Sequence, residues 1–538
     1  MRSPRAIGLA ATAAVVLLLA WFARPVLHGP AMLLWTAPLV WLPPLVIFAS
    51  GVALTWRRRR RITVENILAP RSPAPIVASA LAAVVLFIAL SIVNGPLSAR
   101  ALYEDTRYAD IAQLPSDATV RILPKQVAEQ IASSGFNSPT EFLTDFAITR
   151  TPEGLRWTAI RTPDGLVRTF TKRSQGIVTL DAENSARGLE QIDAEFETAP
   201  RMLITDNLRW KLLKRHYFIE LGEAVGVARE NDRPLIMVPY TEYRGLLVRR
   251  PRAGGVFVVH PGGRIEDLEP EDARRRPELA STGRLFPERL ARRIQDAYAY
   301  KRGIWNRFFV HEEQTQITDT EANRQPYLID FGDRGARWVT VAEPYGRAFA
   351  ANAVFLTDTL TGRTEIWRVP RGRSLSGNRR ALDTVRSVSI PGVTFGNRGA
   401  QGTSGGSFRA VEPRPVFVKG RLLYLVSIVP ESGNSVAKSV IVDAETNKVV
   451  RIFDTDTDPQ ADAKTLAFLR TGAVPGGQEA PAPDEETPAA EAPAQETPAA
   501  GGAQGDGVAE RLDALIRRQR EILRETEALR DRLREGSP

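Results

Sequence analysis

The chain contains no cysteine in its 538 residues, which excludes disulfides, thiol nucleophiles, iron–sulfur clusters and cysteine-ligated zinc. Histidine is also scarce, and the four imidazoles do not have the spacing of metal ligands: His28, His216, His260 and His311. Stability must therefore come from burial of apolar side chains, which domains of about 100 to 200 residues can supply. We predict no cofactor and no metal.

Long apolar runs without charge lie before residue 95, at residues 6–23, 31–56 and 74–93. Each is about 20 residues long, the length that a helix needs to cross roughly 30 Å of hydrocarbon. Residues 1–94 are therefore predicted to form a three-span membrane anchor. The alternative for the first run is a cleaved signal peptide, because Arg2 and Arg5 precede it.

Five consecutive arginines follow the second run and set the predicted orientation: Arg57, Arg58, Arg59, Arg60 and Arg61. Arginine clusters beside membrane spans are held on the cytoplasmic side. We therefore expect a multi-pass plasma-membrane protein with a cytoplasmic N-terminus. Residues 24–30 would form a short outer loop, and the chain from residue 94 onward would be extracytoplasmic.

The first outer segment, residues 95–195, is predicted to be an α+β unit. Residues 95–118 read as a connector, and Leu123, Val127 and Ile131 repeat every four residues, as on one face of a helix. Short β-prone runs separated by Pro-Gly turns then favour an antiparallel meander. The expected strands are residues 142–148, 155–160, 166–170 and 176–180.

Residues 196–325 are predicted to form a mixed helical and β middle domain, and residues 326–470 a β-rich α+β domain. In the middle domain we expect a helix over 184–218, strands at 235–240, 245–248 and 255–260, and a charged helical region over 265–312. Its apolar stripe would be Leu285, Leu290, Ile294, Ala297 and Tyr298. The β-rich domain would have strands at 327–331, 338–342, 354–358, 365–369, 412–418, 422–429, 439–442 and 448–453, with a helix at 381–388.

Residues 439–451 read Ser-Val-Ile-Val-Asp-Ala-Glu-Thr-Asn-Lys-Val-Val-Arg, a strand ending in Asp-Ala followed by a turn and a partner strand. This segment resembles the closing hairpin of PepSY-type extracytoplasmic domains. Residues 412–422 together with 436–454 are similar to the outer domain of a family of large actinobacterial membrane proteins of unassigned function. The resemblance implies an outer-face α+β domain that binds or inhibits partners, and it implies no enzymatic activity.

The C-terminal tail divides into two parts. Residues 471–507 are rich in Ala, Pro, Glu and Gly and are predicted to be a disordered linker. Residues 508–538 follow a heptad pattern and are predicted to form a coiled-coil helix. Its seam would consist of Val508, Leu512, Leu515, Gln519, Ile522, Thr526, Leu529 and Leu533. The helix would either associate with a second copy or pack on a helical partner.

A basic segment with one tryptophan is a candidate patch for an anionic envelope ligand, because such residues suit phosphate or lipid headgroups. It comprises Arg363, Trp367, Arg368, Arg371, Arg373, Arg379 and Arg380. The alternative is an ordinary mixed-charge surface. Nucleic acid is disfavoured as a partner because the segment lies on the predicted outer side.

Candidate catalytic residues are few. The loop at residues 402–407 resembles the nucleophile loop of trypsin-like proteases, and Ser404 would need an imidazole such as His260 or His311 as its base. Two acidic segments, residues 311–321 and 454–462, have carboxylates that a metal ion could use. A flexible glycine–serine loop, a charged helix end and a solvated strand exit are the favoured explanations of these features.

Together these features predict a non-enzymatic, membrane-anchored extracytoplasmic scaffold or binding protein of the cell envelope. Its expected partners are the lipid bilayer, a second copy or a helical protein at the C-terminal helix, and an anionic envelope ligand. The alternative is an envelope hydrolase or transferase that uses the outer domain.

Overall fold

The structure, a computed structural model, describes residues 12, 14–15, 18–19, 21–60, 74–116, 118–185, 188–228, 233–320, 324–346, 349–395, 397–399, 402–404 and 407–473. The chain divides into two compact units, Met1–Gly477 and Gln478–Pro538. Several predictions lie outside the described residues: Arg61, most of the first apolar run, the linker after residue 473, and the heptad seam from Val508 to Leu533.

The predicted outer loop at residues 24–30 is wrong, because these residues belong to helix α2 (Arg24–Thr36). Helix α2 packs against α7 (Leu208–Arg215), and the rings of Trp21 and Trp210 meet edge to face at 4.8 Å. The second apolar run is not one helix either. Ala37 leaves the helical conformation, with φ −128° and ψ 50°, since it precedes Pro38, and α3 (Pro38–Arg60) begins there.

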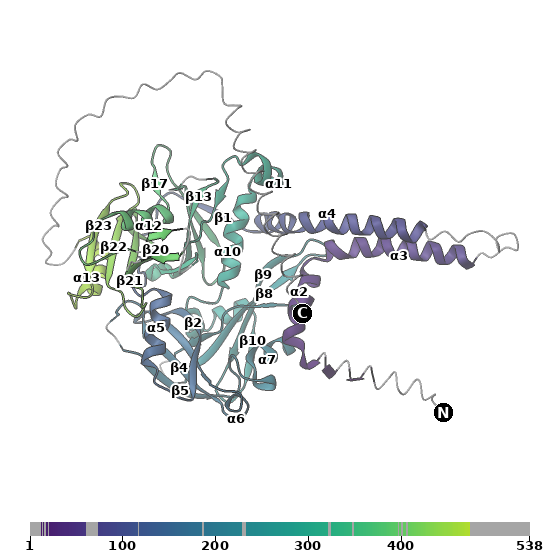
Figure 1. The fold of residues 1–538 in the computed structure, drawn as a ribbon, viewed down its shortest axis with the longest axis horizontal. Helices are drawn as coiled ribbons and strands as arrows, with labels where there is room; N and C mark the ends of the chain where they lie inside the picture. The colour runs from purple at the N-terminus through teal and green to yellow at the C-terminus, as the bar shows by residue number, and fades with distance from the viewer. Residues whose placement is uncertain are drawn as a thin grey trace, which may run out of the picture. The chain divides into compact units, whose positions relative to one another are not determined.

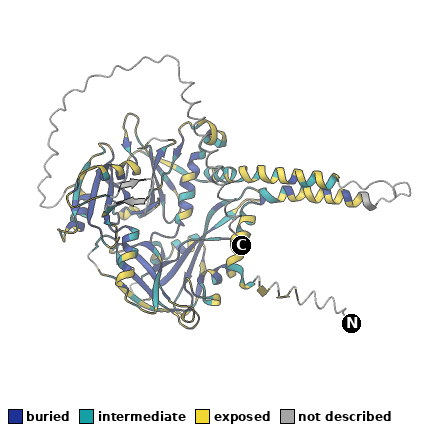
Figure 2. Ribbon diagram, viewed as in Figure 1, coloured by how far each residue is buried: buried dark blue, intermediate teal, exposed yellow. Residues whose placement is uncertain are grey.

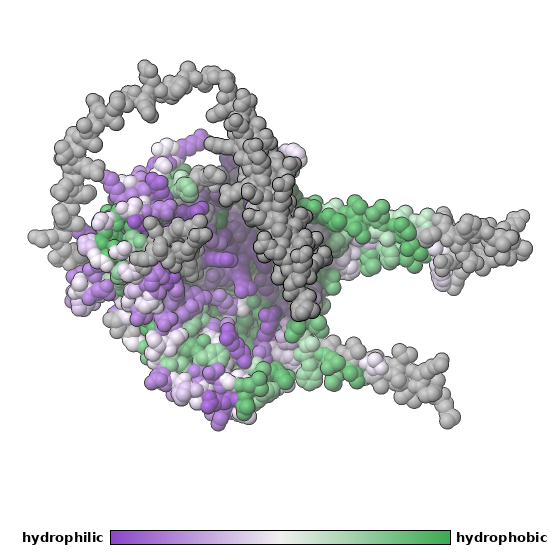
Figure 3. Space-filling model, viewed as in Figure 1, coloured by the Kyte–Doolittle hydropathy of each residue, from purple (hydrophilic) through white to green (hydrophobic). Residues whose placement is uncertain are grey.

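Helices α3 and α4 (Ala74–Asp105) are long and apolar enough to cross a membrane. They pack side by side and project from the folded body with most of their apolar surface exposed (Figures 1, 2 and 3). The two helices touch closely at Gly51, where an added Cβ would lie 1.9 Å from Ser79 Oγ. Helix α4 runs past the predicted span into residues assigned to a connector, because Leu102 is buried in the body.

The arginine cluster lies at the end of α3 that is remote from the folded body. At the near end, the backbone N–H of Leu39 donates to the carbonyl of Leu247 at 3.3 Å. The apolar stretch Pro38–Arg57 has 20 residues, which is about 30 Å of helix. The folded body and Arg57 are therefore separated by about the thickness of a bilayer's hydrocarbon core.

Three of the four strands predicted for the first meander are confirmed, at residues 142–148, 155–160 and 176–180. Strands β2 (Glu141–Thr151), β3 (Gly154–Pro163), β4 (Ser174–Asp181) and β5 (Glu190–Phe196) form an antiparallel sheet in that order. Helix α5 (Lys125–Gly135) precedes the sheet and packs on β2.

Two details of this region differ from the prediction. The segment expected as a strand at 166–170 is the short helix α6 (Arg168–Thr171). The helix expected over 184–218 is divided into β5, the 3-10 turn η2 (Ile204–Asp206) and α7, which starts where Asn207 caps the backbone N–H of Trp210. Gly188 lies just before β5 and Pro200 lies between β5 and η2, and neither residue favours a helix interior.

The middle region contains a five-stranded antiparallel sheet. Its strands are β6 (Glu220–Leu221), β7 (Val225–Val227), β8 (Leu235–Arg244), β9 (Arg250–Val259) and β10 (Ile265–Leu268). The order is β10-β9-β8-β6, with β7 also paired to β8. Residues 245–248, predicted as a strand, instead form the turn of the β8–β9 hairpin.

The charged region predicted as helical over 265–312 begins with strand β10 and continues as a series of short helices. A proline stands at or just before the start of three of them, at Pro270, Pro277 and Pro287. The elements are α8 (Pro270–Arg274), α9 (Pro277–Ala280), α10 (Glu288–Ala297), η3 (Tyr298–Tyr300), α11 (Gly303–Trp305) and the π-helical η4 (Asn306–Val310). The predicted apolar stripe from Leu285 to Tyr298 is buried, as expected.

A six-stranded sheet combines residues far apart in the chain. Its strands are β1 (Tyr108–Ile111), β16 (Thr364–Arg368), β15 (Ala353–Asp358), β13 (Ala336–Pro344), β11 (Thr315–Gln316) and β12 (Tyr327–Asp330). Strand β1, expected as part of a connector, pairs in parallel with β16. Strands β13, β15 and β16 pair antiparallel, and each coincides with a strand predicted from the sequence. Smaller elements are η5 (Gly332–Arg334) and the pairs β14–β17 (Ala350–Ala351, Leu375–Ser376) and β18–β19 (Asn397–Gly399, Gly402–Ser404).

The last sheet is an antiparallel meander of β20 (Phe408–Val418), β21 (Arg421–Pro430), β22 (Lys438–Asp443) and β23 (Val449–Asp454). Helices α12 (Asn378–Ser387) and α13 (Ala461–Thr471) pack against it. Residues 439–451, the segment that resembles the PepSY hairpin, form the β22–β23 hairpin. The folded body is thus a sheet-rich α+β region with antiparallel sheets.

Candidate functional site: a cavity beside α4

A cavity of about 630 Å³ lies where α4 enters the folded body. One wall is α4 itself, through Asn94, Ser98 and Leu102. The facing walls come from the β8–β9 hairpin, α10, η3 and η4, and Thr36 at the end of α2 also contributes. Its volume falls within the range of small-molecule sites, which is about 300 to 1,000 Å³.

Arg249, just before β9, contributes the most distinctive charge to this cavity. Its guanidinium lies 3.6 Å from the centroid of the Trp35 ring, so the two planar groups are in cation–π contact. Ser98 Oγ donates to the Arg249 carbonyl at 2.5 Å and fixes the backbone there. No carboxylate among the described residues pairs with Arg249, and burial lowers the pKa of its guanidinium. Its Nη1 donates only to the carbonyl of Tyr243, at 3.5 Å, so within the described residues this cation has no counter-ion.

Two buried polar atoms that line the cavity have no hydrogen-bond partner in the described structure, Arg249 Nε and Asn94 Oδ1. Buried polar groups are almost always hydrogen-bonded, and each exception calls for an explanation such as a bound molecule. Both atoms lie near the end of the apolar run of α4. Arg249 Nε offers an occupant of the cavity a charged hydrogen-bond donor, and Asn94 Oδ1 offers it a neutral acceptor.

The other two arginines of the cavity are engaged within the protein. Arg293 Nη1 donates to Glu220 Oε2 and to the Tyr243 hydroxyl, both at 2.7 Å. Burial raises the pKa of Glu220, but Arg293 outweighs that effect and holds the pKa below its usual value. Arg307 lies over the rings of Tyr300 and Tyr345. Of the three, Arg249 is the one that combines a buried, unsatisfied Nε with the lack of a carboxylate partner among the described residues.

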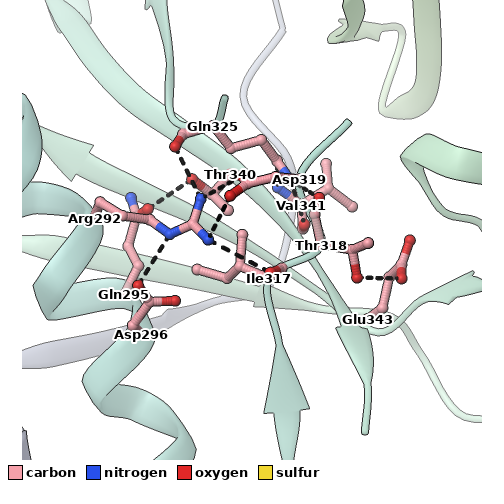
Figure 4. Close-up of polar contacts among 10 residues, drawn as sticks. All are labelled: Arg292, Gln295, Asp296, Ile317, Thr318, Asp319, Gln325, Thr340, Val341 and Glu343. Atoms are coloured by element: carbon pink, nitrogen blue, oxygen red, sulfur yellow. Dashed lines mark hydrogen bonds and ion pairs between the residues drawn. The ribbon is translucent and has the colours of Figure 1, made fainter. Parts of the chain in front are cut away.

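The wall opposite α4 is stiffened by a polar network (Figure 4). At its centre Gln295, which is 1% exposed, donates to Thr357 Oγ1 at 3.0 Å and accepts from Thr340 Oγ1 at 2.6 Å. Arg292 joins the same helix to the neighbouring loop, donating to Asp296 at 3.0 Å and to Asp319 at 2.8 Å. These bonds fix α10 against β13, so the cavity is preformed.

The network ends at Glu343, a buried carboxyl with an unsatisfied oxygen. Glu343 is 3% exposed; its Oε2 accepts from Thr318 Oγ1 at 2.7 Å, and its Oε1 has no partner in the described structure. Burial raises the pKa of Glu343, against the lowering effects of Thr318 and Arg379. The folded protein therefore binds this proton more tightly than the unfolded chain does.

The raised pKa of Glu343 gives a pH-dependent prediction. Stability from the bound proton is complete below the unfolded pKa and is lost as the pH rises through the folded value. Glu343→Gln has no charge at any pH, so its melting temperature relative to the unsubstituted protein should be higher at about pH 8 than at about pH 4. Calorimetry across this range measures the difference. A constant difference would contradict the account.

The predicted basic patch is spread over β16, the following loop and α12. Trp367 is 5% exposed and belongs to the core, so its ring does not lie on the surface that the arginines share. Arg368 pairs with Asp110 at 3.1 Å, and Arg373 pairs with Glu445 at 2.7 Å. Arg379 lies over the ring of Phe349. The remaining members, Arg363, Arg371 and Arg380, are exposed.

The catalytic candidates are not brought together. His260 Nε2 pairs with Glu266 at 2.8 Å, and the His311 ring stacks on Tyr345 with centroids 3.9 Å apart. Ser404 lies in β19. The structure adds a pair that sequence reasoning missed: His216 Nε2 lies 2.5 Å from Asp267. In the described part of the chain no hydroxyl hydrogen-bonds to the His216 ring.

The acidic segments are occupied by cations from the protein. Glu312 and Glu313 pair with Arg302 at 2.6 and 3.1 Å, and Asp458 pairs with Lys464 at 2.6 Å. Among the residues that the structure describes, no group of three or more His, Asp or Glu side chains could hold a metal ion.

Sequence reasoning also missed the cavity. Arg249 is one of several arginines in a turn-rich segment, and nothing in the local sequence distinguishes it from Arg244 or Arg250. The one available signal was the placement of Asn94 and Ser98 directly after an apolar run. Comparisons with known proteins add no assignment, since no protein-family model matches the chain and no curated protein is significantly similar to it.

Proposed function

We propose that this protein is a membrane-anchored, extracytoplasmic binding protein of the cell envelope that holds an anionic amphiphile in the cavity beside α4. The observation that carries the proposal is Arg249, a partly buried cation with an unsatisfied Nε and no carboxylate partner among the described residues. It lines a cavity that adjoins the end of an apolar, membrane-length helix.

The orientation is supported by the placement of the arginine cluster. Arg57 lies at the end of α3 remote from the folded body, about 30 Å along the helix. Clustered arginines beside a span favour the cytoplasmic side. The folded body would then be extracytoplasmic, and α2 would lie on that same side, because it packs on the body through contacts such as Trp35 against Phe218.

The ligand class follows from the charges and surfaces of the cavity. A carboxylate or phosphate group would pair with Arg249 and accept from nearby donors, and such charge-assisted hydrogen bonds are the strong ones. Leu102, Ala99 and Pro251 provide apolar contact for an attached chain. Because the cavity begins beside Asn94, where the apolar run of α4 ends, the bilayer is the nearest source of such a molecule.

The wider role would be that of a scaffold, with the C-terminal heptad segment joining copies or recruiting a helical partner. The resemblance of residues 439–451 to PepSY-type hairpins is in keeping with a binding role. A hydrolase or transferase is a weaker candidate, because Ser404, His260 and His311 come from separate elements and have other contacts where their side chains are described.

The proposal is tested by the thermal stability of the purified full chain in neutral detergent. A ligand that binds only the folded state stabilises it by about 2.7 kcal/mol at 100 times its Kd. Phosphatidylglycerol added to the micelles should raise the melting temperature, and phosphatidylcholine should not. Inorganic phosphate forms a third arm: a rise with phosphate alone would identify a soluble anion as the ligand. Equal response to both lipids would contradict the proposal.

A further inference from the structure

Two apolar protrusions flank the bases of α3 and α4. The first, the aromatic knob, comprises residues 303–310 in α11 and η4. Its side chains are unusually exposed for their type: Trp305 69%, Phe309 66%, Val310 54% and Phe308 49%. The rings of Trp305 and Phe309 pack together, with centroids 4.2 Å apart. A contiguous exposed apolar surface of this kind marks an interaction site.

The second protrusion, the hairpin tip, comprises residues 245–248 between β8 and β9. Leu246 is 85% exposed and Leu247 is 37% exposed. The tip adjoins the start of α3, since the Leu247 carbonyl accepts from the backbone N–H of Leu39. Arg249, at the cavity, follows the tip directly.

The knob adjoins the end of the apolar run of α4. Helix α11 contacts α4, and Figure 1 shows it at the edge of the body from which α3 and α4 project. Arg100 Nη1 donates to the carbonyls of Tyr300 and Lys301 at 2.6 and 3.0 Å. Arg100 lies six residues after Asn94, about 9 Å along the helix, and the headgroup region adds roughly 5 to 8 Å per leaflet. The knob is thus within side-chain reach of lipid headgroups.

The knob is held rigidly on the body. His311, at its end, stacks on Tyr345, and Arg302 pairs with Glu312 and Glu313. The side-chain amide of Asn306 donates to the carbonyl of Glu312 at 3.0 Å. These contacts present the aromatic rings outward in a fixed arrangement.

We propose that the aromatic knob and the hairpin tip insert into the interfacial region of the same bilayer that α3 and α4 span. Tryptophan and other aromatic rings favour this region, and basic side chains beside them pair with lipid phosphates. Lys301 and Arg302 precede the knob, and Arg307 lies within it. The insertion fixes the depth of the folded body, so the cavity opens at the level of the headgroups. This inference rests on the proposed membrane anchorage.

The natural absence of cysteine makes a site-specific test direct. Phe309→Cys and Leu246→Cys are each labelled with an environment-sensitive fluorophore and reconstituted into vesicles of phosphatidylcholine and phosphatidylglycerol. Leu166→Cys, on a leucine that is 74% exposed in the turn before α6, is the matched control outside the interface. Val85→Cys, on an exposed residue of α4, reports on the span itself. A nitroxide carried near the lipid headgroup is the quencher.

The expected result is a shift of emission to shorter wavelength and several-fold quenching at positions 309 and 246, with neither at position 166. Absence of quenching at 309 or 246, with quenching at 85, would overturn this inference alone. Absence of quenching at 85 would overturn the anchorage and the inference together. An emission shift at position 309 or 246 that disappears when more lipid is added per protein would assign the knob to contact between copies. That result would also overturn the inference.

Discussion

Glu412→Ala is expected to destabilise the folded body by about 3 to 5 kcal/mol, the cost of removing one partner from a buried ion pair. Glu412 is fully buried, and its Oε2 accepts from Arg121 Nη2 at 2.9 Å. Its Oε1 accepts from the backbone N–H of Lys125 at 3.0 Å, at the start of α5, where a negative charge is favoured.

A second buried arginine enlarges the effect. Arg414 donates to the carbonyls of Arg121 and Ile122 at 2.9 and 2.7 Å, and burial lowers its pKa to about 10. Without Glu412, two buried guanidinium groups would lie close together without a counter-ion. The cluster joins the segment before α5 to β20, so its loss would loosen contacts between distant parts of the chain.

The measurement is urea-induced unfolding in neutral detergent. Glu431→Ala is the matched control, because Glu431 pairs with Arg409 at 3.2 Å with both side chains partly exposed, and such pairs contribute about 0 to 1 kcal/mol. If Glu412→Ala is no more destabilising than Glu431→Ala, the buried cluster is not a major source of stability.

Arg249→Gln is expected to weaken binding of phosphatidylglycerol by about 10- to 100-fold, since hydrogen bonds to charged groups contribute about 1.5 to 3 kcal/mol. The substitution removes the charge at the cavity and the cation–π contact with Trp35. The melting-temperature rise caused by phosphatidylglycerol measures the effect, because it falls as Kd increases.

Arg244→Gln is the control for this experiment. Arg244 belongs to the same hairpin, its side chain is 63% exposed, and it does not line the cavity. Its substitution should leave the lipid response unchanged. An Arg249→Gln protein that responds to phosphatidylglycerol as fully as the Arg244→Gln protein would refute the assignment of Arg249.

The strands were the most predictable part of this fold. Turn signals such as Thr151-Pro152-Glu153-Gly154 and Leu360-Thr361-Gly362-Arg363 separate β-prone runs, and each lies at a hairpin in the structure. Local turn chemistry fixes these features, so the sequence alone shows them. Pairing between distant strands was not predictable, and β1 shows why: its four residues pair with β16, more than 250 residues later.

The helices whose bounds were predicted incorrectly are those that prolines interrupt or that pack on distant parts of the chain. Apolar content predicted one span over residues 31–56, but Pro38 divides it. The part before Pro38 belongs to α2, where Trp35 stacks on Phe218 of the body. Periodicity also predicted 265–312 as mostly helical, although the region opens with β10 and its prolines divide the rest into short helices. Composition measures how apolar a segment is, and it does not show which surface buries that segment.

The candidate site was hidden for the same reason. Asn94, Arg249 and Tyr300 come from α4, a hairpin and η3, and only the fold places them around one cavity. Glu412 was predicted only as the first residue of a strand. Its burial depends on Arg121, which is nearly 300 residues away in sequence.

The most direct test of the account is the side of the membrane on which the folded body lies. Leu166→Cys in the body and Ser72→Cys, between α3 and α4, each give the chain a single thiol. A membrane-impermeant maleimide is applied to spheroplasts. The account predicts that the Leu166→Cys protein is modified at once and the Ser72→Cys protein only after lysis. The reverse pattern would contradict the orientation set by the arginine cluster and, with it, the proposed extracytoplasmic function.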